Sequence, residues 1–376
     1  MTESEEEQLI EENILICYTG SASQVEIPEG VTEIGPGAFQ NNTSLQNVTI
    51  PQSVEKIDRN AFRGCAQLEK VEFPMTNLEL GEFAFYGCSS LSGILEFPEN
   101  LSSIRKGAFQ GCSGLEGVIL PEYLAEIGDN AFYYCTGLSG ELSVPPRVRR
   151  IGSQAFYNCS NLSTLILQEG LEAIGDYAFS QCSGMKGDLT LPDTLTALGT
   201  SAFSSCSQFE RLTLSENLTQ IKVYTFSDCK GISGEIVIPD SVVSVGYDAF
   251  RGLTGVECFV FGTGLQKLNA DSGYYSYSSF SGCTGVKTLK FRGSTPPSLE
   301  KYTGAFREMS ALTSVIVPVG TYQAYSSAYG SNLPDNARIT EEGSDGILIQ
   351  DGIVVGYTGH DTQVEIPEGV TEIGTG

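Results

Sequence analysis

The residue types that most often carry out catalysis occur in very different numbers in this chain. It has 11 cysteines but a single histidine, His360. A Ser-His-Asp or Cys-His device needs a histidine base beside its nucleophile, so one histidine near the C-terminal end leaves little scope for that chemistry. The sequence also lacks a phosphate-binding loop, an H-E-x-x-H zinc motif, a dinucleotide fingerprint and an EF-hand loop. We therefore expect a protein that is not an enzyme, with no metal site and no cofactor.

Carboxylates are plentiful, with 46 Asp and Glu against 21 Lys and Arg and a net charge of -25. Paired carboxylates can hydrolyse glycosides, but nothing in the sequence marks one pair above the rest. The charge argues against nucleic acid and anionic lipid surfaces, because both bind Lys and Arg. No apolar run approaches the ~20 residues of a membrane helix. We expect no nucleic-acid partner, no membrane insertion in this segment, and a preference for basic proteins.

The cysteines follow a regular pattern instead of forming clusters. No two have the spacing of a Cys-x-x-Cys ligand pair. Nine stand three residues after a phenylalanine: Cys65, Cys88, Cys112, Cys135, Cys159, Cys182, Cys206, Cys229 and Cys283. Asn42, Leu253 and Met309 fill the same position elsewhere, and the replacement by Leu and Met indicates a buried apolar site. We expect nine buried free thiols, because side chains stacked in parallel at about 4.8 Å do not converge as a disulfide requires. Cys17 and Cys258 lie off the pattern and are expected to be the reactive ones.

The phenylalanines reveal the unit that must position these thiols. They are Phe39, Phe62, Phe85, Phe109, Phe132, Phe156, Phe179, Phe203, Phe226, Phe250, Phe280 and Phe306. The intervals between them are 23 or 24 residues as far as Phe250, and then 30 and 26. A period in the twenties is typical of a leucine-rich-repeat solenoid, in which each coil contributes one strand and one turn segment.

One copy of the unit runs from Pro121 to Pro145, with Ile127-Gly128, Ala131-Phe132 and Cys135 before a β-rich run. We expect each glycine of the Ile-Gly pair to have a positive φ or to lie against a neighbouring backbone. This skeleton resembles that of the BspA-like leucine-rich-repeat proteins. Together, the period and the resemblance predict a strand-rich solenoid of the α/β horseshoe class. It would be a right-handed curved coil of about 12 to 13 repeats of 23–24 residues, with a parallel β-sheet on its concave face.

The resemblance also implies a function. BspA-like proteins are typically secreted or surface proteins of bacteria, with relatives in some parasitic protists, and are implicated in adhesion to host proteins or other cells. The chain is accordingly expected to be a non-catalytic extracellular or cell-surface binding and adhesion module for a protein ligand, such as host matrix or another cell surface. Two alternatives stay open: a carbohydrate-binding module that recognises a glycan, and a structural spacer within a larger surface protein.

The pattern divides the chain into four segments. Residues 1–12 form an acidic tail that we expect to be disordered. Residues 13–318 form the repeat array, and we expect its first residues, Ile14–Tyr18 and Gln24–Ile27, to pair as a capping hairpin. Residues 319–340 form a C-terminal cap with a short helix between Thr321 and Gly330.

Residues 341–376 are interpreted as a linker and the truncated start of a second array. The last residues closely repeat residues 14–37, and Gly376 matches Gly37, after which an Ala-Phe pair follows in the first array. We expect the chain to be a piece of a longer protein, with the secretion signal and anchor missing.

Alternation along each strand assigns the candidate binding residues, because residues two apart share a face. Glu141, Asp188 and Glu235 are 47 residues apart and would lie outward on alternate strands. The long interval before Phe280 contains Tyr274, Tyr275 and Tyr277, and tyrosine offers broad contact area with a polar tip. We expect a ligand to contact these tyrosines and the neighbouring Val237, Val260 and Lys290. Two alternatives to a ligand role stay open. The acidic residues would serve solubility, and the tyrosine insertion would be neutral variation of the repeat.

Overall fold

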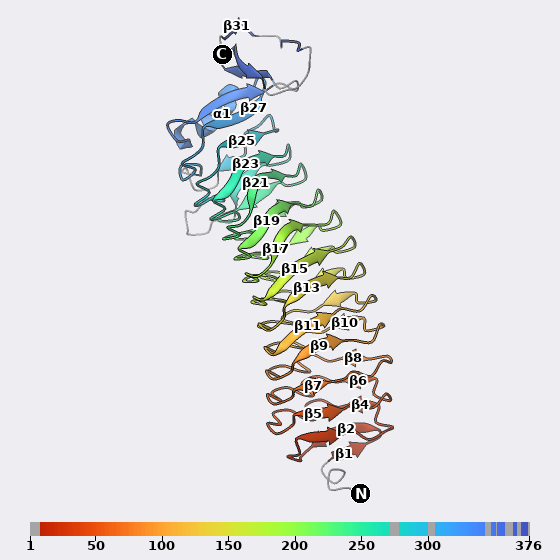
Figure 1. Cartoon of the computed structure of the whole chain (residues 1–376). Helices are drawn as coiled ribbons and strands as arrows, with labels where there is room; N and C mark the ends of the chain where they lie inside the picture. Colours follow the sequence, from red (N-terminus) through yellow and green to blue (C-terminus); the bar gives the residue numbers. More distant parts are fainter. Residues whose placement is uncertain are drawn as a thin grey trace. The chain divides into compact units, whose positions relative to one another are not determined.

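The computed structural model describes residues 8–270, 278–299, 305–342, 347–350, 352–357, 364–366 and 370–374. The chain divides into two units. Unit 1 comprises Met1–Gly187 and Leu191–Gln208, and unit 2 comprises Asp188–Thr190 and Phe209–Gly376. Strands β17 (Lys186–Thr190) and β19 (Gln208–Thr213) contain the points of division. Within each unit successive coils stack through parallel strands, which confirms the solenoid prediction (Figure 1).

Each coil of unit 1 contributes two strands, seen as two columns in Figure 1. The longer ones are β3 (Gln24–Glu26), β5 (Asn47–Thr49), β7 (Lys70–Val71), β9 (Gly93–Glu96), β11 (Leu115–Ile119), β13 (Gly140–Val144) and β15 (Leu162–Leu167). The shorter ones are β4 (Glu33–Ile34), β6 (Lys56–Ile57), β8 (Glu79–Leu80), β10 (Ser103–Ile104), β12 (Glu126–Ile127), β14 (Arg150–Ile151), β16 (Ala173–Ile174) and β18 (Ala197–Leu198). The isoleucine of each Ile-Gly pair thus ends a two-residue strand, and these short strands pair in parallel from coil to coil as a second ladder.

The glycines that follow these short strands make the second ladder possible. A Cβ on Gly152 would lie 2.4 Å from Asp129 N, and one on Gly175 would lie 2.5 Å from Ser153 N. Neither glycine has a positive φ. Close approach of the neighbouring coil, the second of the two expected reasons, therefore explains them.

A third ladder runs through the turn segments around each Ala-Phe pair. Phe39 N–H donates to Ala61 O at 2.7 Å, and Asn41 N–H donates to Arg63 O at 2.7 Å. As far as Phe250, the residues two positions before and two positions after each phenylalanine have left-handed backbone, which orients the N–H and C=O groups toward the neighbouring coils. The residues other than glycine that adopt it are Asn41, Asn60, Phe83, Asn130, Tyr134, Gln154, Asn158, Tyr177, Gln181, Ser201, Ser205, Tyr224, Asp228 and Asp248.

The phenylalanine spine, meaning the column Phe39 to Phe306 named above, is buried. The ring centroids of Phe132 and Phe156 are 5.2 Å apart with planes 9° from parallel, and those of Phe156 and Phe179 are 5.4 Å apart at 1°. Each buried ring contributes roughly 1.5–3 kcal/mol. The spine is therefore a major source of stability within each unit.

The N-terminal hairpin differs from the prediction. β1 (Gln8–Glu11) pairs antiparallel with β2 (Ile14–Tyr18) through a two-residue turn at Glu12 and Asn13, both with positive φ. Residues 8–11 are therefore a strand, although we expected a disordered tail over 1–12. The expected partner of β2, β3, pairs instead with β5 in the longer-strand ladder.

Unit 2 repeats the two-column plan. Its longer strands are β21 (Ser233–Ile238), β23 (Gly255–Phe261), β25 (Thr288–Phe291) and β27 (Ser314–Pro318), and its shorter ones are β20 (Gln220–Ile221), β22 (Ser244–Gly246), β24 (Lys267–Ala270) and β26 (Ser298–Leu299). The longer-strand sheet continues through β28 (Arg338–Glu342), β29 (Ile347–Gln350), β30 (Ile353–Tyr357) and β31 (Glu372–Ile373). Glu341 and Glu342, which we expected to begin a linker at residue 341, thus belong to strand β28.

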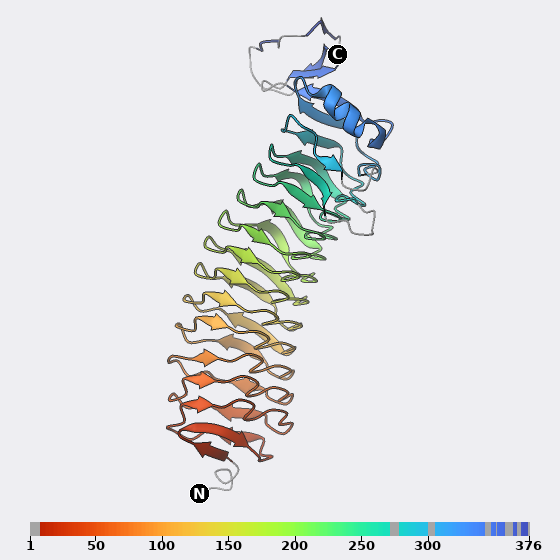
Figure 2. The ribbon, with the colours of Figure 1, turned by 180° about the vertical axis from the view of Figure 1, so that it is seen from behind.

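Helix α1 (Tyr322–Tyr329) and the 3₁₀ turn η1 (Gly330–Asn332) join β27 to β28 (Figure 2). The helix follows Thr321 and ends at Gly330 as predicted, and it buries Tyr325 and Tyr329. Tyr329 donates to Pro297 O at 2.6 Å. Thr321 does not cap the helix, because its hydroxyl donates to Pro318 O; Glu341 Oε1 instead accepts the Tyr322 N–H at 2.6 Å.

Candidate functional site

The cysteine column is a structural element of the core. All nine of its thiols are free and buried, as predicted. Cys159 Sγ donates to Phe132 O at 3.2 Å, and Cys182 Sγ donates to Phe156 O at 3.1 Å, in each case in the preceding coil. Burial raises the pKa of Cys65 and of Cys182 to about 12. A protonated, enclosed thiol is a poor nucleophile, so this column is unsuited to chemistry.

The two cysteines off the column have different surroundings. Cys17 lies half-buried on β2, and Cys258 lies half-buried on β23. Burial, followed by the nearby Glu235 carboxylate, raises the pKa of Cys258 to about 12, although Lys290 acts in the opposite direction. A raised pKa lowers the fraction of Cys258 that is thiolate near neutral pH, which works against its reactivity.

The sheet of unit 2 brings four of the predicted binding residues together. Glu235 on β21 faces Cys258 on β23, and Val237 faces Val260, which in turn faces Lys290 on β25. Val260 is only 3% exposed, however, so its predicted ligand contact is wrong for this conformation. Val237 and Lys290 lie on either side of it in the ladder, which leaves little of its side chain to solvent.

Lys290 already has an ion-pair partner within the chain. Its ammonium forms an ion pair with Glu342 on β28, whose side chain is 10% exposed. Glu235 remains exposed on the same face. This surface consequently offers a carboxylate and little accessible apolar area. Tyr274, Tyr275 and Tyr277, the other residues predicted to bind ligand here, lie outside the described residues.

Glu141 and Asp188 belong to different units. Glu141 is exposed on β13 of unit 1 and Asp188 is exposed on β17, within the part assigned to unit 2. Glu141 lines a hollow of about 380 Å³ with Ile119, Glu122 and Gln168. Glu141 therefore borders a hollow on the surface of unit 1.

The longer-strand face of unit 1 has a feature that the sequence reading did not single out. Met75, Ile94, Ile119 and Tyr123 are 60%, 61%, 55% and 49% exposed. Ile94 lies over Gly117 of the next strand, where an added Cβ would be 3.3 Å from Ile94 Cγ1. Alternation does place Ile94 and Ile119 outward, but only the structure shows that both stay uncovered within this unit. We call these four residues the apolar strip.

Three hollows follow the apolar strip. One of about 610 Å³ lies over β5, β7 and β9 and is lined by Met75 and Ile94. A second of about 500 Å³ is lined by Met75 and Tyr123, and the third is the hollow beside Ile119 and Glu141. Met75 borders the first two, so they adjoin one another.

Acidic side chains border the strip, although Arg147 stacks over the Tyr123 ring at 4.4 Å. Glu72 and Glu96 line the first hollow, Glu99 lines the second and Glu122 lines the third. Lys70 is paired with Glu72 at 2.5 Å. Glu96, Glu99 and Glu122 form no ion pair with a described residue, so a bound cationic group would find them available.

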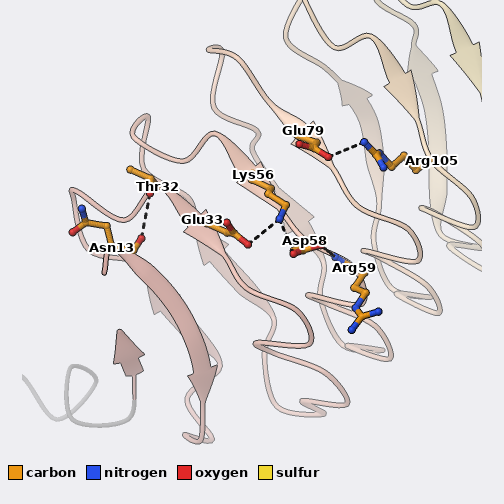
Figure 3. A network of polar contacts seen from close by, with 8 residues as sticks. All are labelled: Asn13, Thr32, Glu33, Lys56, Asp58, Arg59, Glu79 and Arg105. Atoms are coloured by element: carbon orange, nitrogen blue, oxygen red, sulfur yellow. Dashed lines mark hydrogen bonds and ion pairs between the residues drawn. The ribbon is translucent and has the colours of Figure 1, made fainter. Parts of the chain in front are cut away.

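The shorter-strand face of unit 1 has a different electrostatic character (Figure 3). Lys56 Nζ lies 3.0 Å from Glu33 and 2.8 Å from Asp58, and Arg105 Nη2 lies 2.7 Å from Glu79. Lys56–Glu33 and Arg105–Glu79 join successive coils, whereas Lys56–Asp58 lies within one coil. The charges on this face are largely paired with one another, which leaves the longer-strand face as the better candidate for a ligand.

The turn side of unit 1 carries a cluster of tyrosines. Tyr133 lies 4.7 Å from Tyr134 and 5.1 Å from Tyr157 between ring centroids. Gln181 Nε2 donates to the Tyr157 hydroxyl at 2.7 Å. Tyr134 is among the exposed large side chains. This second surface combines aromatic area with hydroxyl groups.

Across the part of the chain that the structure describes, no three His, Cys, Asp or Glu side chains are grouped closely enough to hold a metal ion. In the same residues no helix has the length and apolarity to cross a membrane.

Two solved structures with a TM-score of at least 0.50 share the fold. A leucine-rich repeat protein from Bacteroides ovatus is 24% identical with a TM-score of 0.62, over 85% of this chain and 83% of that one. The pneumococcal vaccine antigen PcpA is 19% identical with a TM-score of 0.50, over 84% and 78%. A leucine-rich cell surface protein from Faecalibacterium prausnitzii is 23% identical with a TM-score of 0.42, over 74% and 90%. No curated protein matches the chain.

The sequence itself carries the family assignment. The family model for the BspA type leucine rich repeat region, of 6 copies, matches residues 10–139, 139–257 and 234–341. These matches cover most of the chain and coincide with the coils that hold the spine and the thiol column. The chain belongs to the BspA-type leucine-rich-repeat family.

Proposed function

We propose that this chain is a non-catalytic module of the cell surface that binds a basic protein through the apolar strip of unit 1. The observation that carries the proposal is the row of exposed Met75, Ile94, Ile119 and Tyr123 along three hollows. Contiguous exposed apolar patches with a polar rim are typical of interaction sites. The surface location rests on the family's typical setting, and the description of PcpA as a vaccine antigen agrees with it.

The charge of the surroundings gives the class of partner. The chain carries -25 overall, and Glu96, Glu99 and Glu141 border the strip. A cationic partner would be steered to this face and would approach more slowly as salt is added. The apolar residues would supply affinity, since central, well-packed anchors carry most of the binding energy at protein interfaces.

Paired variants would test the proposal. Ile94→Ser with Ile119→Ser removes two anchors and is expected to weaken binding to a basic matrix protein at least tenfold. Val243→Ser, at another exposed apolar residue, is the matched control and is expected to bind like the parent. Both can be measured by surface plasmon resonance at low and high salt, with circular dichroism as a check of folding.

The same measurement separates the alternatives. If binding survives Ile94→Ser with Ile119→Ser but is lost when Tyr274, Tyr275 and Tyr277 become Ser, the tyrosine insertion is the site instead. Loss on reversing the charge of Glu141, Asp188 and Glu235, without loss in the Ile variants, would assign binding to the acidic residues. Absence of binding to any protein or glycan would favour a structural spacer.

A carbohydrate ligand is the second candidate, favoured by the cluster of Tyr133, Tyr134 and Tyr157 on the turn side. Aromatic faces with adjacent hydroxyl groups offer apolar contact and hydrogen bonds together. Binding on a glycan array that is lost in Tyr134→Ala, but kept in Ile94→Ser with Ile119→Ser, would support this candidate over the first.

A further inference from the structure

The hairpin that opens the array occurs a second time in the chain. Residues 347–357 correspond to residues 8–18 at a fixed offset of 339, as in the alignment of Tyr357 with Tyr18. β29 pairs antiparallel with β30 as β1 pairs with β2, and the register shift falls at the equivalent place in each, between Leu348 and Ile349 and between Leu9 and Ile10. The onward pairing matches too, because β30 joins β31 in parallel as β2 joins β4.

The two hairpins differ at their outer edges. In unit 2 the outer edge of β29 pairs antiparallel with β28, with Glu341 opposite Ile349 and Glu342 opposite Leu348. We call β28 the array-end strand, because it is the last strand of the longer-strand sheet before the second hairpin. In unit 1 β1 ends its sheet, and no described strand pairs with its outer edge. The chain therefore contains one hairpin with an array-end strand and one without.

The side chains of β1 reflect this difference. Ile349 is 4% exposed beside β28, whereas its counterpart Ile10 is only half-buried. Leu9 is 51% exposed, whereas its counterpart Leu348 is half-buried. β1 thus leaves uncovered the apolar positions that an array-end strand covers in the duplicate, and an open strand edge is a template for pairing.

We propose that the outer edge of β1 is a docking site for the array-end strand of a second array of this kind. The strand would add antiparallel, with the residue equivalent to Glu342 opposite Leu9 and the one equivalent to Glu341 opposite Ile10. Arrays would then join end to end by strand addition. In an isolated chain β28 is held by its own β29, whose tethered position gives it a high effective concentration.

The test uses β28 of a second copy as the probe strand in the full-length chain. Ile349→Pro disrupts β29 and frees β28, because proline cannot donate to the ladder. This variant is expected to form a concentration-dependent series of head-to-tail oligomers in analytical ultracentrifugation, whereas the parent stays monomeric. Ile10→Pro, the equivalent change in β1, is expected to be monomeric alone and to abolish the oligomers when combined with Ile349→Pro. Ile349→Asp provides a second way of freeing β28 if the proline variant folds poorly.

Register gives a sharper check. In the Ile349→Pro chain, Leu9→Cys and Glu342→Cys are expected to yield an intermolecular disulfide, with Cys17→Gly removing the thiol opposite residue 9. Glu11→Cys in place of Leu9→Cys is the control and is expected to yield little. The proposal is overturned if both freed variants remain monomeric, if oligomers persist with Ile10→Pro, or if the control cross-links equally well.

Discussion

At the residue scale, Asp248 stands out because its environment opposes its charge. Its side chain is 0% exposed, it has a left-handed backbone in the position two residues before Phe250, and neither carboxylate oxygen has a hydrogen-bond partner among the described residues. Arg251 Nη1 is 3.9 Å away. Burial, the largest cause, raises the pKa of Asp248. Asn occupies the equivalent left-handed position at Asn60 and Asn130.

Asp248→Asn is therefore expected to stabilise the folded chain at neutral pH, because a neutral amide costs less free energy to bury than a carboxylate without hydrogen-bond partners. A pKa raised by folding means that the wild-type carboxyl loses stability as pH rises from the unfolded value, about 3.9, through the folded one. The gain should shrink as pH falls below that window. Thermal unfolding from pH 3 to pH 8 measures it, and a lower midpoint for Asp248→Asn at pH 7 would contradict the argument.

Asp58→Asn serves as a control, because its expected effect on stability at neutral pH has the opposite sign. Burial alone would raise the pKa of Asp58, but hydrogen bonds from Lys56 and from Arg59 N outweigh it, so the pKa is lowered. A carboxyl of this kind contributes stability above its unfolded pKa and loses it as pH falls through the folded pKa. Asp58→Asn should therefore destabilise the chain at pH 7, and the loss should fade in acid.

At the element scale, the short strands depend on glycine as well as on side-chain burial. β14 and β16 are two residues long, and Gly152 and Gly175 follow them against the backbone of the preceding coil. A methyl group at either position must push two coils apart. The ladder therefore tolerates variation at an exposed strand residue such as Arg150 better than at these glycines.

Gly152→Ala is expected to cost about 1–3 kcal/mol, as overpacking of a tight core usually does. Gly330→Ala, at the end of α1, is the control: its φ is -50° and the nearest atom to an added Cβ is 3.8 Å away. That change should be neutral or slightly stabilising, because it restricts the unfolded chain without strain. Urea denaturation would compare them, and equal midpoints would show that the coils separate at little cost.

At the scale of the whole molecule, each coil contacts mainly its neighbours, so stability is a sum of local terms. Phe156→Ala opens a cavity between the rings of Phe132 and Phe179. We expect a loss of about 3–5 kcal/mol. Hydrogen exchange should quicken in these adjoining coils of unit 1, while amides of β25 in unit 2 keep their protection. Uniform loss of protection in both units would show that the chain unfolds as one cooperative body.

The periodic residues made the repeat, the spine and the buried thiols predictable, because a position that recurs twelve times reports a shared environment. The short strands were missed because two residues show no alternation. The left-handed positions were missed because Asn, Gln, Tyr, Ser and Asp share no obvious side-chain property. The pairing predicted for β2 was wrong because strand propensity does not specify which strands pair. Outward placement of Ile94 followed from alternation, but its exposure depends on neighbouring coils.

The turn-side ladder, in which Phe39 N–H donates to Ala61 O and its equivalents do the same in the next coil, has a consequence for how such genes change length. Every coil presents the same donors on one side and the same acceptors on the other. Unequal crossing-over that adds or deletes a whole coil, or a 47-residue pair, leaves no donor without an acceptor at the new joint. Recombination can therefore lengthen or shorten the protein in complete coils, while a deletion of part of one would break all three ladders.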